Sequence, residues 1–143
     1  MVLSWEAGGS SVNAELLAHR VVELIEGASF PHLDPTSVIG VIALLLAGAG
    51  LVTVRDYALG GDFRLPLLAA EPYPRVEASI GVVPALGGLT EPVERQLHHA
   101  AQHPAVDLVV LVTTAAESGL LPRRIDGVPV LTAVAGARAD QTT

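Results

Sequence analysis

The sequence predicts a single α/β domain with a mixed sheet of about five strands, an N-terminal helical pair and one parallel strand, helix, strand crossover. The chain has 143 residues, about the usual length of one domain. Its apolar residues follow a helical period in some segments and form short strand-like runs in others. The order of these segments is typical of an α/β fold. We therefore expect residues 1–143 to form one domain, with residues 1–12 and 136–143 loose.

Two helices are expected in the first third of the chain. Asn13 is a candidate N-cap for a helix that ends at Gly27. Asp34 followed by Pro35 is the pattern of an N-cap and a first helical position. It predicts a second, almost wholly apolar helix that runs to about Gly48 and lies buried at the centre of the fold.

Residues 37–54 are uncharged, mostly apolar and close in number to the roughly 20 residues that cross a bilayer. We expect a buried helix leading into a strand instead of a membrane span, because Gly40 and Gly48 interrupt the segment and basic anchors do not flank it. The N-terminus lacks a secretory pattern and the chain lacks cysteine, so we expect a cytoplasmic location.

Five strands are expected, near residues 51–56, 63–68, 76–83, 106–112 and 128–134. The motif Gly60-Gly61-Asp62 predicts a turn between the first two. Pro66 favours an edge position for the second strand, because proline has no backbone N–H to donate. A helix over residues 91–103 connects the third and fourth strands, which predicts that these two strands are parallel.

Composition excludes several kinds of chemistry. All eight cationic side chains are arginine, and the sequence contains neither lysine nor cysteine. These 143 residues therefore hold no Schiff-base or phosphate-loop lysine, no thiolate nucleophile and no cysteine zinc site. The net charge of -7 disfavours binding to nucleic acid, because affinity for phosphates depends on neutralising cations.

The order helix, strand, strand, strand, helix, strand over about residues 36–134 resembles the core of the restriction-endonuclease-like nucleases, the PD-(D/E)xK superfamily, and its Mrr-type members. Two local features add to the resemblance: Asp62 follows the Gly-Gly turn, and Glu77 lies on the expected third strand. The resemblance implies that Asp62 and Glu77 hold a divalent metal such as magnesium, which activates water.

The sequence departs from the nuclease motif at one decisive position. The family has E-x-K on the third strand, whereas this chain has Glu77-Ala-Ser79, so a hydroxyl replaces the lysine. Arg75 is the remaining candidate for catalytic positive charge, but its guanidinium stays protonated and is a poor proton shuttle. If the fold is nuclease-like, we expect catalysis to be absent.

Three histidines occur close together in the helix expected over residues 91–103. His99 and His103 are one turn apart, a spacing that can chelate zinc or nickel. A third ligand is not evident, and Leu97 and Ala100 mark the buried side of the helix. We therefore expect these histidines on the solvated face or near its edge.

Two other segments are candidates by position alone. Residues 87–90 precede a helix N-terminus, where free backbone N–H groups can receive a phosphate, but the complete phosphate-loop motifs are missing. Polar side chains also follow the expected central strand, where ligands bind in open α/β sheets. These are Thr113, Thr114, Glu117 and Ser118.

Without a complete catalytic signature, the leading hypothesis is a non-catalytic interaction or assembly protein without a cofactor. It would be a homo-oligomer or a small subunit of a larger complex. A metal-dependent nuclease with a degenerate site is one alternative. A winged-helix-like DNA-binding regulator is another, with helices at 13–27 and 35–48 and a hairpin at 51–68. The second of these helices is too apolar to contact base edges.

Overall fold

The computed structural model describes residues 2–72, 78–115 and 121–137. The helices in these ranges are α1 (Val2–Glu26), α2 (Pro35–Gly48) and α3 (Glu91–Gln102). The strands are β1 (Ser29–Phe30), β2 (Val52–Gly60), β3 (Phe63–Ala70), β4 (Ser79–Pro84), β5 (Leu108–Thr113), β6 (Arg124–Ile125), β7 (Val128–Val134) and β8 (Gly136–Ala137).

A six-stranded mixed sheet in the order β2-β3-β4-β5-β7-β6 forms the centre of the fold. The pairs β2–β3, β3–β4 and β6–β7 are antiparallel, whereas β4–β5 and β5–β7 are parallel. Helix α3 connects β4 to β5, so the expected parallel crossover is confirmed. A separate short pair joins β1 to β8.

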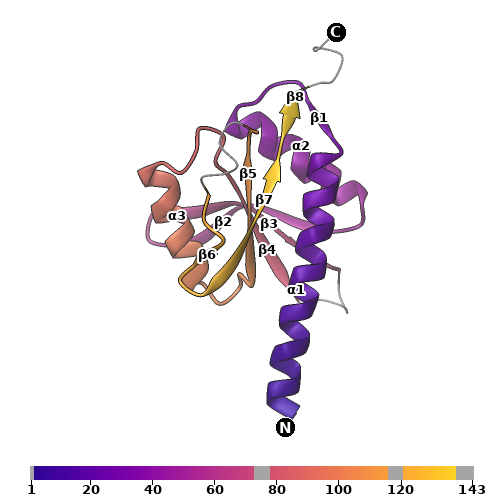
Figure 1. Cartoon of the computed structure of the whole chain (residues 1–143), viewed down its shortest axis with the longest axis vertical. Coiled ribbons are helices and arrows are strands. Elements are labelled where there is room, and N and C mark those ends of the chain that lie inside the picture. The colour runs from indigo at the N-terminus through magenta and orange to yellow at the C-terminus, as the bar shows by residue number, and fades with distance from the viewer. Residues whose placement is uncertain (1, 73–77, 116–120, 138–143) are drawn as a thin grey trace.

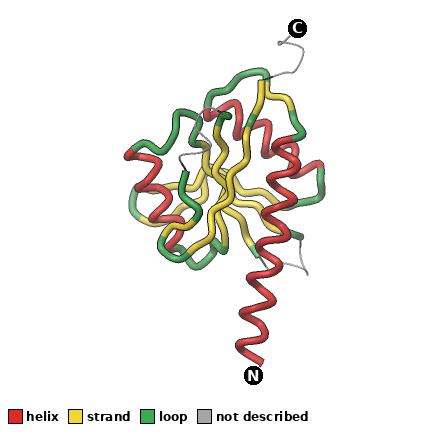
Figure 2. Tube along the Cα trace, viewed as in Figure 1, coloured by secondary structure: helices red, strands yellow, loops and turns green. Residues whose placement is uncertain are grey.

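The sheet has helices on both sides. Figure 1 shows α1 and α2 on one side and α3 on the other, and Figure 2 shows the twisted strands between them. Each face has its own apolar cluster. The α1/α2 side includes Val21, Ile25, Ile42, Leu67, Ile80 and Val110, and the α3 side includes Leu65, Val83, Leu97, Ala100, Val109 and Leu111. The expected α/β class with an N-terminal helical pair is confirmed.

Helix α2 begins where the sequence predicts. The backbone N–H of Ser37 donates to the Asp34 carboxylate at 2.9 Å, and Pro35 occupies the first turn. This hydrogen bond is the main reason why the pKa of Asp34 lies below its ordinary value, and the Ser37 side chain lowers it further.

Only one face of α2 is buried. Ile42 and Leu46 pack against the sheet, whereas the side chain of Leu44 is 77% exposed. The expectation of a wholly buried helix is therefore wrong, because α2 belongs to an outer layer of the fold. None of the helices in the described ranges has the length and apolar content needed to cross a bilayer.

The described termini are more regular than expected. Helix α1 begins at Val2 instead of Asn13, and its first half extends away from the sheet (Figure 1). The glycines at positions 8 and 9 lower helix propensity, but unlike proline they do not remove the backbone N–H, so the helix continues through them. Gly136 and Ala137, which were expected to be loose, pair with Ser29 and Phe30.

Pro66 does not place β3 at an edge, because β3 pairs with both β2 and β4. Its pairing with β4 begins at Leu67, immediately after the proline, so the missing N–H lies outside that ladder. On the other side, Asp56 lies opposite Pro66, between the pairs Arg55–Leu67 and Tyr57–Leu65. Asp56 has a φ of 54°, which kinks β2 at this point.

The kink changes which side chains of β2 face each layer. Thr53 and Arg55 lie next to α2 on one side of the sheet. Two residues later, Tyr57 packs on the opposite side, where its ring meets that of His103 with centroids 5.4 Å apart. The tip of the β2–β3 hairpin therefore contacts α3, and the regular part of the β2 edge ends at Arg55.

Candidate functional site

The nuclease-like residues do not form a described cluster. Asp62 lies in the turn before β3, where it lines a shallow hollow with Arg64 and Arg95. Glu77 and Arg75 lie outside the described residues. Ser79 pairs with Ala70 at the far end of β3, so about 25 Å of strand separates Ser79 from Asp62 at roughly 3.4 Å per residue.

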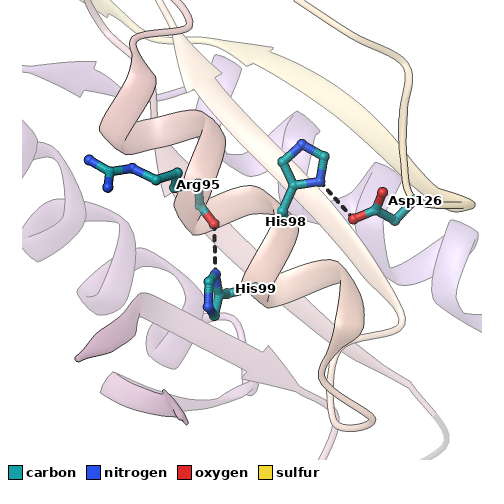
Figure 3. A network of polar contacts seen from close by, with 4 residues as sticks. All are labelled: Arg95, His98, His99 and Asp126. Carbon is teal, nitrogen blue, oxygen red and sulfur yellow. Dashed lines mark hydrogen bonds and ion pairs between the residues drawn. The ribbon is translucent and has the colours of Figure 1, made fainter. Parts of the chain in front are cut away.

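The two histidines of α3, His98 and His99, have different partners (Figure 3). His98 Nδ1 lies 2.7 Å from Asp126 Oδ2, and both side chains are partly exposed. His99 Nδ1 bonds to the carbonyl oxygen of Arg95 at 3.1 Å, and the His99 ring stacks on Phe63 with centroids 3.6 Å apart. These side chains connect α3 to the β6–β7 turn and to the β2–β3 hairpin.

His103 is held at the end of the same helix. Its Nδ1 accepts a hydrogen bond from the backbone N–H of Ala105 at 3.0 Å, so this nitrogen carries no proton in that arrangement. The three histidines are partly buried, which agrees with the expected position near the edge of the solvated face. Within the described ranges, no three His, Asp or Glu side chains are grouped as potential metal ligands.

The loop before α3 is poorly suited to an anion. Glu91 and Glu94 occupy the first turn of the helix, where their negative charges already interact with its positive dipole end.

The polar residues expected after the central strand do not form a described site. The Thr113 hydroxyl is fully buried and donates to the carbonyl oxygen of Ala85 at 2.9 Å, which connects the loop before α3 to β5. Thr114 is partly exposed, and Glu117 and Ser118 lie outside the described residues.

A different surface lies at the free edge of β2. This strand is the first in the sheet, and among the described strands it pairs with β3 alone. Val52 and Val54 are 49% and 43% exposed on the side of the sheet opposite α2. Thr53 and Arg55 face the other side and line a groove of about 600 Å³ together with α2.

The groove and the outer face of α2 form one continuous surface, here called the β2–α2 surface. None of the described residues that line the groove is acidic. The guanidinium of Arg55 forms no hydrogen bond or ion pair with the described residues, whereas its backbone pairs with Leu67. Leu44 is the most exposed large apolar side chain of this surface. The lining comprises Pro31, His32, Ser37, Gly40, Val41, Ala43, Leu44, Ala47, Thr53 and Arg55.

The opposite edge of the sheet is covered at both ends of β7. Strand β6 pairs with the beginning of β7, and the Glu26 carboxylate accepts from the backbone N–H of Val134 near its end. Helix α1 also packs along β7. Natural sheets cover their edges in this way to prevent pairing with another chain. The bare β2 edge is therefore the candidate functional site.

Two features of the sequence indicate this surface, although sequence reasoning missed it. Helix α2 is uncharged around its whole circumference, and Val52 and Val54 alternate with Thr53 and Arg55. Without the strand order, both features are equally consistent with burial inside the domain.

No protein-family model, no curated protein and no solved structure matches the chain.

Proposed function

We propose that this protein is a non-catalytic assembly subunit that binds other protein chains through the β2–α2 surface. The proposal rests on one observation: a bare strand edge and an uncharged helix face border the same groove. It keeps the cytoplasmic location expected from the sequence.

Binding a partner stabilises both the edge of β2 and the apolar side chains beside it. A strand edge presents unpaired backbone N–H and C=O groups, which another extended segment satisfies. The apolar side chains of α2 and β2 lose contact with water when they are covered, at roughly 25 cal/mol per Å² of apolar area. A helix that is apolar all round is typically buried on all sides, but Leu44 and Ala47 on the outer side of α2 are exposed.

The alternative functions require different arrangements. A metal-dependent nuclease brings its carboxylates to one ion, and the described part of β4 begins far from Asp62. A DNA-reading helix needs polar side chains for base edges, and after Ser37 α2 carries only apolar residues. The β2–β3 hairpin also belongs to the central sheet instead of forming a separate wing.

The test compares two leucines of similar exposure. Leu44 lies on the β2–α2 surface, and Leu16 on α1 is 65% exposed elsewhere. We expect Leu44→Glu to lower the amount of protein bound to the tagged chain in its own cells at least tenfold, whereas Leu16→Glu leaves it unchanged. Melting curves of both variants control for folding.

Two results would contradict the proposed function. One is equal binding by wild type, Leu44→Glu and Leu16→Glu. The other is plasmid cleavage by the purified chain with magnesium that is lost in Asp62→Ala, because such cleavage assigns the function to the nuclease-like residues.

A further inference from the structure

We propose that the partner at the β2–α2 surface is a second copy of this chain, and that the two β2 strands pair antiparallel across a two-fold axis. This inference rests on the proposed function, because it names the occupant of the same surface. The result is an isologous dimer with one continuous sheet.

The shape of the edge requires an extended partner. Backbone groups along β2 are satisfied at the usual strand spacing of about 4.8 Å, which another β-strand provides and a helix does not. At the other end of the sheet, β6 and the Glu26 carboxylate occupy the two ends of the β7 edge, so the stretch of free edge between them is short. Within the described sheet, the longest free edge that a second copy can offer is its own β2.

The side chains of β2 select one antiparallel register. Residues that lie directly opposite each other in such a pair point to the same face of the sheet. Placing Thr53 opposite Thr53 of the second copy sets each Val52 against a Val54, which gives two valine pairs on one face. Arg55 then lies opposite Leu51, so like charges are not directly opposed.

A neighbouring register that also preserves the faces is less favourable. It places Val54 opposite Val54 and Thr53 opposite Arg55, so it has only one valine pair. It also sets Val52 against Asp56, whose φ of 54° takes it out of the extended ladder. The Thr53-centred register uses only residues 51–55, which precede this kink.

The same symmetry places the two α2 helices together. The two-fold axis passes midway between the two opposed Thr53 residues and is perpendicular to the sheet. Both copies therefore keep α2 on the same side of the sheet, next to the new strand pair. Leu44 faces outward from this part of α2, with Gly40 and Ala47 beside the same groove. Because Gly40 and Ala47 are small, the two helices can approach each other closely, and their contact covers Leu44.

Charge also favours a second copy at this surface. Two chains of net charge -7 repel each other when their carboxylates come close. The groove lining contains no acidic side chain among its described residues, and it includes Arg55 and His32. Contact through the groove therefore brings no carboxylate of its lining against the second copy.

The chain has no cysteine, so a single introduced thiol reports the register directly. Opposed residues of an antiparallel pair have Cα atoms roughly 4.5–5.5 Å apart, within the range that a disulfide spans. We expect full-length Thr53→Cys to form a disulfide-linked dimer under mild oxidation at least tenfold faster than Thr132→Cys on the opposite edge strand. Val54→Cys should cross-link more slowly than Thr53→Cys.

Sedimentation of the wild-type chain, which has no cysteine, measures its oligomeric state and completes the test. We expect a dimer that dissociates on dilution, a dissociation constant at least tenfold higher for Leu44→Glu, and no change for Leu16→Glu. Equal cross-linking of Thr53→Cys and Thr132→Cys, or a monomer at all concentrations, would overturn the inference. A monomer that still binds another protein through Leu44 would overturn it while leaving the proposed function intact, and a monomer that binds nothing would overturn both.

Discussion

The carboxylate of Glu26, the last residue of α1, accepts a hydrogen bond from the backbone N–H of Val134 at 2.9 Å. The bond satisfies a donor on the outer side of β7 with a side chain instead of another strand. The edge of β2 has no such cover among the described residues. The two ends of the sheet therefore differ in their capacity to bind a further chain.

Replacing Glu26 removes this cover. Glu26→Ala should lower the free energy of unfolding by about 1 kcal/mol, because the Val134 donor loses a charge-assisted hydrogen bond. Glu23→Ala, an exposed position one turn earlier on α1, is the matched control and should change stability by less than about 0.5 kcal/mol. Urea unfolding measures both, and equal effects would show that the bond to Val134 does not stabilise the fold.

The Thr113 hydroxyl stabilises the loop between β4 and α3. Thr113→Val should lower the free energy of unfolding by about 1 kcal/mol, because the bond to the Ala85 carbonyl is lost from a fully buried site. Amide exchange at Gly88, which donates to the same carbonyl, should become faster. Thr114→Val, at the next and partly exposed position, should leave both quantities unchanged.

The N-cap of α2 should make stability depend on pH. The pKa of Asp34 is lower in the folded chain than its ordinary value, so its contribution is complete at neutral pH and is lost as the pH falls through the lowered pKa. Asp34→Ala should therefore lower the melting temperature at neutral pH, and the difference from wild type should shrink in acid.

Asp34→Asn is the control for this titration, because asparagine caps a helix without ionising in this range. Its difference from wild type should be smaller than that of alanine at neutral pH. A melting-temperature difference between Asp34→Ala and wild type that is the same at neutral and acidic pH would contradict the assigned role of the carboxylate.

The kink at Asp56 should respond oppositely to two substitutions. Asp56→Gly should raise the free energy of unfolding by up to about 1 kcal/mol, because glycine adopts a positive φ without the cost imposed by a side chain. Asp56→Val should lower it by more than about 1 kcal/mol, because a β-branched residue is strained in this conformation. If both variants have the stability of wild type, β2 is not kinked at this residue in solution.

Short-range sequence patterns correctly predicted the start of α2 and the parallel pairing of β4 with β5. The Asp34-Pro35 pair placed the start of α2, and the helix between two apolar runs predicted the parallel pair β4–β5. The start of α1 was missed because glycine and serine weaken a helix without ending it. Strand β6 was missed because it has two residues, although the Asp126-Gly127 turn that follows it has the positive φ values of a two-residue hairpin.

The position of an element in the sheet depends on distant contacts, which the sequence does not display. Pro66 suggested an edge strand, but the β4 ladder begins one residue later, so β3 lies inside the sheet. The apolar character of α2 suggested full burial because a sequence does not reveal how many layers cover a helix. The candidate surface follows from the strand order, which leaves β2 at the edge and α2 beside it.

Hydrogen exchange at several protein concentrations tests the central claim most directly. If two copies pair through β2, backbone amides of residues 51–55 should gain protection as the concentration of the wild-type chain rises, and amides of residues 128–134 should not. Leu44→Glu should abolish this dependence, whereas Leu16→Glu should retain it. Exchange at residues 51–55 that is independent of concentration, in a chain shown to be dimeric, would contradict the account because the dimer would then use another surface.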